Sequence, residues 1–143
     1  MDMAMDIIAV VISGIALALT ILQYIIEANR QKKEATLLAY NSLQDEVFSE
    51  LRKYDLGSIK KGDKGWNEVT TCLAKIENFS VGINTRIYSL DIVNRLGGSF
   101  VIGQFEKLLP VINQKRQEDE NSKHYDEFEK VIVKLKKKRG EIK

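Results

Sequence analysis

The stretch that decides the fold is Ile7–Ile26, IIAVVISGIALALTILQYII. Its 20 residues include no charged side chain and no proline. An α-helix rises about 1.5 Å per residue, so this length reaches roughly 30 Å, the thickness of a bilayer's hydrocarbon core. The stretch therefore predicts one transmembrane helix, and we assign residues 1–27 to the membrane segment.

The residues that flank this stretch predict its orientation. A cleaved signal peptide is the alternative, but it needs basic residues before a short apolar core. Here Asp2 and Asp6 come first, and Arg30 is the first basic residue. Because Lys and Arg mark the cytoplasmic side, Arg30, Lys32 and Lys33 predict an N-terminus outside and the rest of the chain in the cytoplasm.

Small and polar residues recur along the predicted membrane helix at alternating steps of four and three. At about 100° per residue they share one side of the helix, and Ile, Leu and Val cover the other. We call this set the polar face: Asp6, Ala9, Ser13, Ala16, Thr20, Gln23 and Glu27. Lipid cannot satisfy a Gln amide, so membrane helices turn such residues toward one another. The face predicts a homo-oligomer, or a complex with another membrane protein, in left-handed packing.

Two interpretations of the polar face remain open at this point. The first is a contact between packed helices with no water inside. The second is the lining of a narrow water-filled pore, with Thr20 and Gln23 toward the lumen and Asp6 and Glu27 at its mouths.

The remainder of the chain is predicted to be helical, because it contains one proline and 29% of the whole sequence is charged. Residues 28–56 predict a stalk helix without a break from the membrane span, and residues 66–139 predict a cytoplasmic helical domain. The stalk has one apolar stripe: Leu37, Tyr40, Leu43, Val47, Leu51 and Tyr54. The predicted fold class is all-α, with one N-terminal transmembrane helix that continues into an oligomeric helical bundle.

Four helices are predicted in the domain, at residues 66–88, 89–96, 99–118 and 124–143. Gly82 costs about 1 kcal/mol relative to Ala inside a helix, which predicts a closely packed neighbour. Ser89 is expected to cap the second helix, which Gly97 and Gly98 end. Pro110 is expected to kink the third helix or to start a new turn.

Two basic segments have more than one interpretation. The loop at 55–65, DLGSIKKGDKG, lacks the spacing of a phosphate-binding loop and follows no strand. It is either a solvated connector or a contact for an anion or a phospholipid. The basic end of the last helix, residues 134–143, is a solvated helix end, a contact for anionic lipid, or a contact for nucleic acid.

The sequence offers little for catalysis. His124 is the only histidine and Cys72 the only cysteine, so the usual ligands of a zinc site are lacking. Cys72 lies on the apolar side of its helix, where a small buried residue is the usual interpretation. A lone thiol also fits a reducing compartment. We expect no catalytic residue, no metal, no cofactor and no enzymatic activity.

Three short motifs are similar to those of a known group of proteins. They are Gly82–Tyr88 (GINTRIY), Gly97–Phe100 (GGSF) and Glu106–Ile112 (EKLLPVI), within a region of about half the chain. This region resembles a family of small bacterial proteins of unknown function, which have an N-terminal membrane helix and a cytoplasmic helical domain. The resemblance implies a location in the bacterial inner (cytoplasmic) membrane.

Some proteins of this kind resemble membrane effectors of antiphage defence such as the Hailong system, whose effector forms a channel. There a nucleotidyltransferase makes a nucleotide or oligonucleotide that controls the membrane protein. The resemblance implies an ion channel, an operon-encoded nucleotidyltransferase and a nucleotide or single-stranded oligonucleotide ligand. Cationic residues of the domain are candidate ligand contacts: Arg52, Lys60, Lys61, Arg86 and Arg95.

Arg86 and Arg95 are the leading candidates, because they lie near Gly82 and Gly97, where a backbone can approach a ligand closely. A surface salt bridge is the alternative for each of the five cations. The alternative function is a membrane-tethered helical scaffold that recruits a cytoplasmic partner and has no pore.

Overall fold

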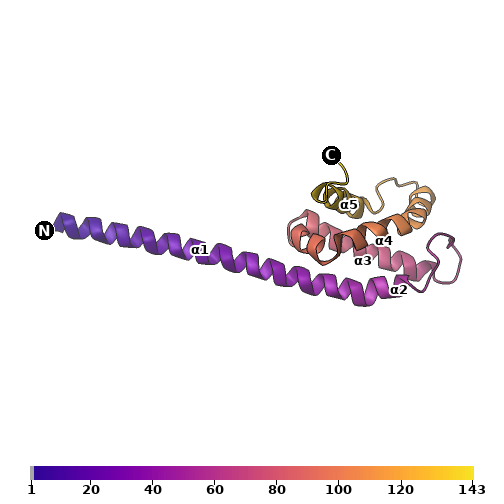
Figure 1. Ribbon diagram of the computed structural model, residues 1–143, viewed down its shortest axis with the longest axis horizontal. Coiled ribbons are helices and arrows are strands. Elements are labelled where there is room, and N and C mark those ends of the chain that lie inside the picture. The colour runs from indigo at the N-terminus through magenta and orange to yellow at the C-terminus, as the bar shows by residue number, and fades with distance from the viewer. Residues whose placement is uncertain (1) are drawn as a thin grey trace.

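One continuous helix forms the first third of the molecule. The computed structural model describes residues 2–143. Its N-terminal helix runs unbroken for 50 residues, from Asp2 to Leu51, which corresponds to about 75 Å. It comprises α1 (Asp2–Ser42), a π-helical segment η1 (Leu43–Phe48) and α2 (Ser49–Leu51). The N-terminal part of this helix projects far beyond the rest of the molecule (Figure 1).

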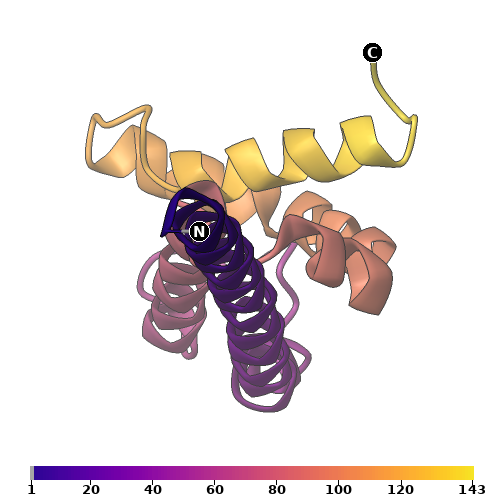
Figure 2. The ribbon, with the colours of Figure 1, turned by 90° about the vertical axis from the view of Figure 1, so that its left-hand side faces the viewer.

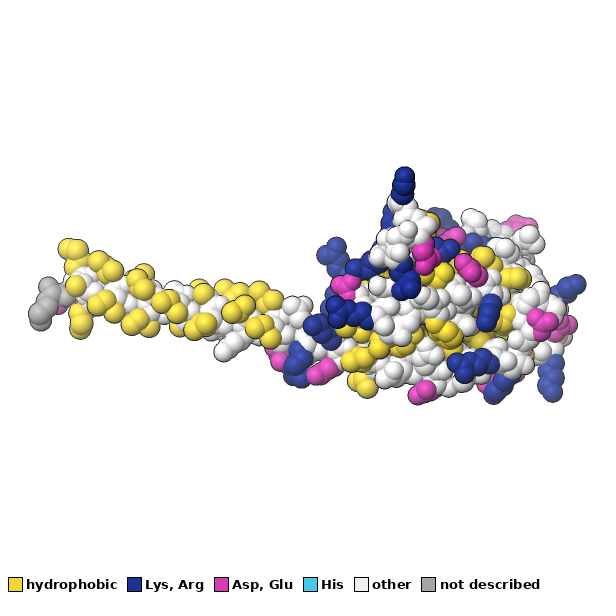
Figure 3. All heavy atoms as spheres, viewed as in Figure 1, with side chains coloured by type: hydrophobic (Ala, Val, Ile, Leu, Met, Phe, Trp, Pro, Cys, Tyr) yellow, Lys and Arg dark blue, Asp and Glu magenta, His cyan; other side chains and the backbone are white. Residues whose placement is uncertain are grey.

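The projecting part is predominantly apolar, apart from the polar face, and is not buried against the domain. None of its apolar segment is buried inside the chain, and Figure 3 shows exposed hydrophobic side chains along the length of it. Such a surface is unusual for a protein in water. Among residues 2–143 this is the one helix long and apolar enough to span a membrane.

The apolar stripe predicted for the stalk is confirmed in part. We call residues 28–51 the stalk. Tyr40, Leu43, Val47 and Leu51 of the predicted stripe are buried, whereas Leu37 stays 39% exposed. The π-helical segment inserts an extra residue into a turn, so that Phe48 is buried directly beside Val47.

The stalk helix ends at Leu51, five residues before the predicted end at 56. The chain then turns into a loop that lasts to Gly65. Asp55 holds the start of this loop, because its carboxylate accepts hydrogen bonds from the backbone N–H of Gly57 (3.2 Å) and the hydroxyl of Ser58 (2.7 Å). A side chain that bonds its own turn competes with the helix, which accounts for the early end.

Three further helices form the domain: α3 (Trp66–Asn84), α4 (Leu90–Glu118) and α5 (Asp126–Lys138). Helix α5 packs against both α3 and α4, and the stalk contacts α3 and α4. Figures 1 and 2 show the stalk along one edge of the domain and α5 across the opposite side, transverse to the long helix. No strand occurs within residues 2–143, so the all-α prediction is confirmed.

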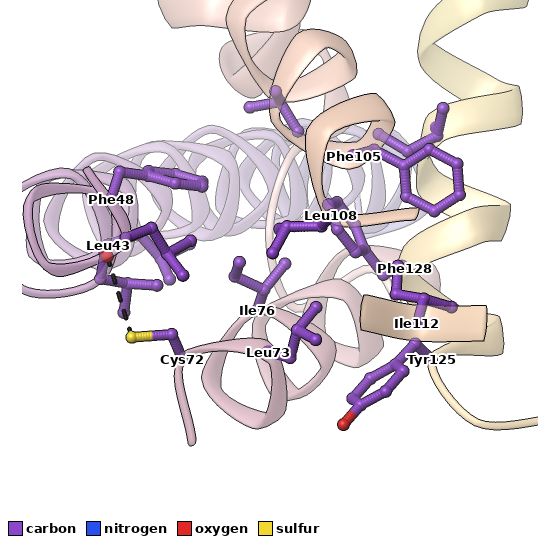
Figure 4. Packing of buried hydrophobic residues seen from close by; sticks show 14 of the residues in the cluster. Leu43, Phe48, Cys72, Leu73, Ile76, Phe105, Leu108, Ile112, Tyr125 and Phe128 are labelled. Atoms are coloured by element: carbon purple, nitrogen blue, oxygen red, sulfur yellow. Dashed lines mark hydrogen bonds between the residues drawn. The ribbon is translucent and has the colours of Figure 1, made fainter. Parts of the chain in front are cut away.

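A single hydrophobic core joins the stalk to the three helices (Figure 4). Phe48 of the stalk, Leu73 of α3, Leu108 of α4 and Phe128 of α5 are each at most 1% exposed. The rings of Phe105 and Phe128 meet edge to face, with centroids 5.1 Å apart. The stalk is therefore an integral part of the domain's core and is continuous with the helix that projects from it.

Helix α4 combines two of the predicted helices. Its backbone angles leave the helical range at Gly97 (φ 178°, ψ 43°), so the predicted break lies where expected but is a kink within one element. Ser89 caps the helix as predicted, since its hydroxyl accepts from the backbone N–H of Ile92 (3.4 Å). The helix continues through Pro110 to Glu118, and no new helix begins at the proline.

The other predicted helices are shorter in the structure. Helix α3 ends at Asn84 rather than 88, and α5 spans Asp126–Lys138 rather than 124–143. The start of α5 is held from outside, because Tyr125 at its N-cap makes no side-chain cap. Instead the carboxylate of Glu77 on α3 accepts from the backbone N–H groups of Glu127 (3.0 Å) and Phe128 (2.8 Å). Such caps depend on tertiary packing, which local sequence patterns do not reveal.

Candidate functional site

The polar face and the domain lie on opposite sides of the long helix. Thr36, Tyr40 and Leu43 are buried against the domain. At about 100° per residue, this buried side is roughly 180° from the positions of the polar face. Glu34 and Asn41 continue the side of the polar face along the stalk, and both are exposed. Figure 3 shows charged side chains on the side away from the domain, just beyond the apolar segment. The domain therefore leaves the polar face of the long helix uncovered.

Two polar side chains of this face differ in what they can offer a neighbour. The Thr20 hydroxyl donates to the backbone carbonyl of Ala16 (2.9 Å), so its proton is already used within the helix. Within residues 2–143, the Gln23 amide has no hydrogen-bond partner. An amide with two donors and an acceptor is costly to leave unpaired in hydrocarbon. Gln23 thus provides the strongest requirement for a partner helix or for water.

The carboxylate of Glu27 has charged and polar partners on its own helix. Arg30 contacts Glu27 at 2.7 Å and Glu34 at 2.6 Å, and the Gln31 amide also donates to Glu27 (3.0 Å). All of these residues are on the same helix. The cluster of Glu27, Arg30 and Glu34 therefore carries about one net negative charge per copy, the same as a lone Glu27 carboxylate, but this charge is spread over two turns of the helix.

The five cationic candidates do not form one site. Lys61 is paired with Glu118, which raises the pKa of the Lys61 amine. Lys60 lies in the exposed loop, and Arg95 lies on the exposed side of α4. Arg52 and Arg86 line two separate clefts. The predicted set is thus divided among the loop after the stalk, two separate clefts and the exposed side of α4.

Arg52 lines a cleft at the end of the domain farthest from the apolar segment, which we call the distal cleft. Its volume is about 500 Å³. Gln104 lines it while only 8% exposed, and no hydrogen bond reaches its amide from the described part of the chain. Pro110 also lines it and lacks an N–H, so the carbonyl of Glu106 has lost its helical donor. The distal cleft therefore holds polar groups that can take a ligand.

Two cationic side chains that line the distal cleft are not engaged in ion pairs. Arg52 and Lys107 make no ion pair with any described residue. The carboxylate of Glu106 lies 3.5 Å from the Lys136 amine, and Asp55 is occupied by its own turn. An anion that enters this cleft would thus meet two unpaired cations.

Arg86 lines a smaller cleft at the opposite end of the domain, which we call the proximal cleft. Its volume is about 260 Å³, and it lies between the stalk, the end of α3, the start of α4 and α5. Three cations line it: Lys32, Arg86 and Lys134. Its one carboxylate, Asp91, is paired with Lys138, and this contact together with Arg95 and Lys32 holds the pKa of Asp91 below its usual value. The proximal cleft is therefore strongly electropositive.

The two glycines near Arg86 and Arg95 are not open to a ligand. A Cβ on Gly82 would collide with the ring of Tyr88, and a Cβ on Gly97 would collide with the hydroxyl of Tyr40. The close approach at each glycine is thus made by the protein's own aromatic side chains. The packed neighbour predicted for Gly82 is confirmed, and the suggested ligand approach at both glycines is wrong.

The groups considered for catalysis have structural partners. Cys72 is buried, as predicted, and its Sγ lies 3.9 Å from the backbone carbonyl oxygen of Val47. The His124 Nε2 lies 2.7 Å from an oxygen of Asp119. Within residues 2–143, no three His, Cys, Asp or Glu side chains are placed to hold a metal ion.

One protein family matches nearly the whole chain. The model described as "Domain of unknown function (DUF4760)" matches residues 8–135. The chain belongs to the DUF4760 family. The matched DUF4760 region begins inside the apolar segment and ends within α5, so the apolar helix, the stalk and the domain belong to one family unit. No curated protein and no solved structure matches the chain.

Proposed function

We propose that the protein is a homo-oligomeric ion channel of the bacterial inner membrane, in which the polar face lines the pore and the cytoplasmic domain controls it. The observation that carries this proposal is the position of the polar face, opposite to the domain along an unbroken helix. An oligomer closed around this face puts the domains on the outside and Gln23 inside. There a water-filled lumen can satisfy the Gln23 amide.

The same proposal assigns control to the distal cleft. Leu51 and Arg52, at the end of the long helix, line this cleft. An anionic ligand held by Arg52 and Lys107 acts on that helix, and the π-helical segment lies between the cleft and the span. Such segments often occur at functional sites. We propose a nucleotide or oligonucleotide as the ligand and an antiphage effector as the role, with an operon-encoded nucleotidyltransferase as its source.

Depolarisation of bacterial cells tests the pore. The full chain is induced and followed with a voltage-sensitive dye, alone and together with the neighbouring gene. We expect wild type to depolarise the membrane and Gln23→Leu to abolish this effect. The matched control is Leu22→Ile, on the opposite side of the span. Equal flux from wild type and Gln23→Leu would rule out this face as the pore lining.

Single cysteines test the oligomer independently of flux. In a Cys72→Ala background, Ala16→Cys on the polar face should form disulfide-linked dimers in membranes upon oxidation. Val11→Cys on the opposite side should not. If both positions cross-link equally, the polar face is not the contact between copies.

The second candidate is a membrane-tethered scaffold without a pore. It is favoured by Leu38, which is 73% exposed on the free side of the stalk and offers an apolar contact to another protein. Cross-linking at Ala16→Cys without any depolarisation, under either condition, would support this function over the channel. Survival of the cells in a phage challenge would then show whether the scaffold still acts in defence.

A further inference from the structure

The proximal cleft brings together cations from three elements that are remote in sequence. Lys32 comes from the stalk, Arg86 from the loop after α3, and Lys134 from α5. None of the three forms an ion pair with a described residue. Lys134 donates to the side-chain oxygen of Asn84 (2.8 Å), a neutral partner that orients the amine, and the Glu127 carboxylate, which feels the charge of Lys134, is itself paired with Lys130. The first turn of α4 also opens onto the cleft and favours an anion there.

Arg86 is held in a backbone conformation that a side chain rarely adopts. Its φ is +65°, in the left-handed region, where the Cβ of a residue other than glycine comes too close to the following carbonyl oxygen. The turn is closed by two hydrogen bonds, from the N–H of Arg86 to the carbonyl of Ile83 (3.0 Å) and from the N–H of Tyr88 to that of Gly82 (2.9 Å). Glycine would fit this turn at lower cost, so arginine here supplies a cation to the cleft at the expense of stability.

The position of the cleft along the long helix limits what can reach it. Lys32 follows Ile26 by six residues, which is about 9 Å along the helix axis. The headgroup layer extends about 5–8 Å beyond the hydrocarbon on each side. The buried Thr36 hydroxyl accepts from the backbone N–H of Ser89 (2.8 Å), which fixes the start of α4 beside Thr36, about 6 Å farther along the helix axis than Lys32. A long cationic side chain at the level of Lys32 reaches the phosphates of the leaflet that faces the domain.

We propose that the proximal cleft binds the phosphate of an anionic phospholipid in that leaflet. The loop at 55–65 does not contact the same leaflet as the proximal cleft of its chain, because it lies at the opposite end of the domain (Figure 1). The bound headgroup ties the domain to the membrane surface and sets its angle to the span. This inference requires only that Ile7–Ile26 crosses a bilayer, and it stands whether or not the polar face conducts ions.

Binding of short-chain lipids to the full-length protein in a neutral maltoside detergent tests the site. Isothermal titration compares dioctanoyl phosphatidylglycerol, dioctanoyl phosphatidylcholine and glycerol 3-phosphate. We expect phosphatidylglycerol to bind at least about tenfold more tightly than phosphatidylcholine, which carries no net charge. Glycerol 3-phosphate should bind more weakly because it has no acyl chains. Equal affinity for the two lipids, or tight binding of glycerol 3-phosphate, would overturn the proposal, the latter in favour of a soluble phosphate ester.

A variant of the three cations tests their role: Lys32→Gln, Arg86→Asn and Lys134→Gln together. Asn tolerates the left-handed backbone at 86, and Gln at 134 can still donate to Asn84. Each cation near an anionic surface is worth about fivefold in affinity, so the triple variant should lose roughly a hundredfold for phosphatidylglycerol. The control removes the same charge elsewhere, with Lys64→Gln, Lys75→Gln and Lys123→Gln. Unchanged binding by the first triple variant, or equal losses in both, would contradict the assignment to this cleft.

Discussion

The hydroxyl of Thr36 accepts a hydrogen bond of 2.8 Å from the backbone N–H of Ser89, and donates one of 2.7 Å to the backbone carbonyl of Lys32. Thr36 is fully buried. This one side chain therefore joins the stalk to the start of α4 in the domain. Its bond to Ser89 is shorter than the 3.9 Å contact between Cys72 and Val47, which also links the domain to the long helix.

Replacing Thr36 by Val should weaken this link. Val keeps the shape but leaves the Ser89 N–H without its partner, at a cost of about 1–3 kcal/mol. We expect Thr36→Val to lower the Tm of the full-length protein in detergent by several degrees, measured by circular dichroism. Thr71→Val, at an exposed position of α3, is the control and should change the Tm little. An equal Tm for both variants would show that the link is not a determinant of stability.

Two Gly→Ala substitutions in helices should have opposite effects. At Gly82 the new methyl group meets the ring of Tyr88, whereas at Gly103 nothing lies within 4 Å. Gly103→Ala should stabilise by about 0.5–1 kcal/mol, because Ala is the better helix former. Gly82→Ala should destabilise, and Tyr88→Ala in the same chain should reduce that loss. Thermal unfolding measures the signs, and a stabilising Gly82→Ala would refute the packing argument.

Removing the external cap of α5 should loosen that helix. Glu77 accepts from two backbone N–H groups at the start of α5, and an uncharged amide accepts less strongly there. We expect Glu77→Gln to cost about 1 kcal/mol and to speed hydrogen exchange in the first turn of α5. Glu46→Gln serves as the matched control, since Glu46 makes only a 3.9 Å contact with Lys75. Exchange in α5 that is the same in both variants would argue against the cap.

The buried Cys72 thiol should make the free energy of unfolding decrease at alkaline pH. Burial raises the pKa of Cys72 above its ordinary 9.0, so the folded state holds this proton more tightly than the unfolded state. The stabilisation is complete below the ordinary pKa and is lost as the pH rises through the raised value. As the pH is raised from 8 to 10.5, the Tm of wild type should therefore fall relative to the Tm of Cys72→Ala. A constant difference would show that the thiol does not titrate with unfolding.

Local patterns in the sequence were sufficient for several features. The uncharged run at Ile7–Ile26 predicted the one helix able to span a membrane, because its length and composition need no tertiary information. Period-3.6 spacing placed Tyr40 and Val47 in the core. Ser89 was identified as a cap from its residue type and position. The ends of the stalk and of α3 were placed too late, because Asp55 and the turn at Arg86 stop these helices through bonds that depend on the following residues.

By itself, the sequence determined that the chain has one apolar span, a polar face on that span and an all-helical body. Each depends on residues within a few turns of one another. Only the tertiary structure decided that the domain packs on the side of the stalk opposite to the polar face, and that Lys32, Arg86 and Lys134 line one cleft. These residues are about 50 positions apart, and they meet because the long-range packing of one shared core sets the positions of their helices.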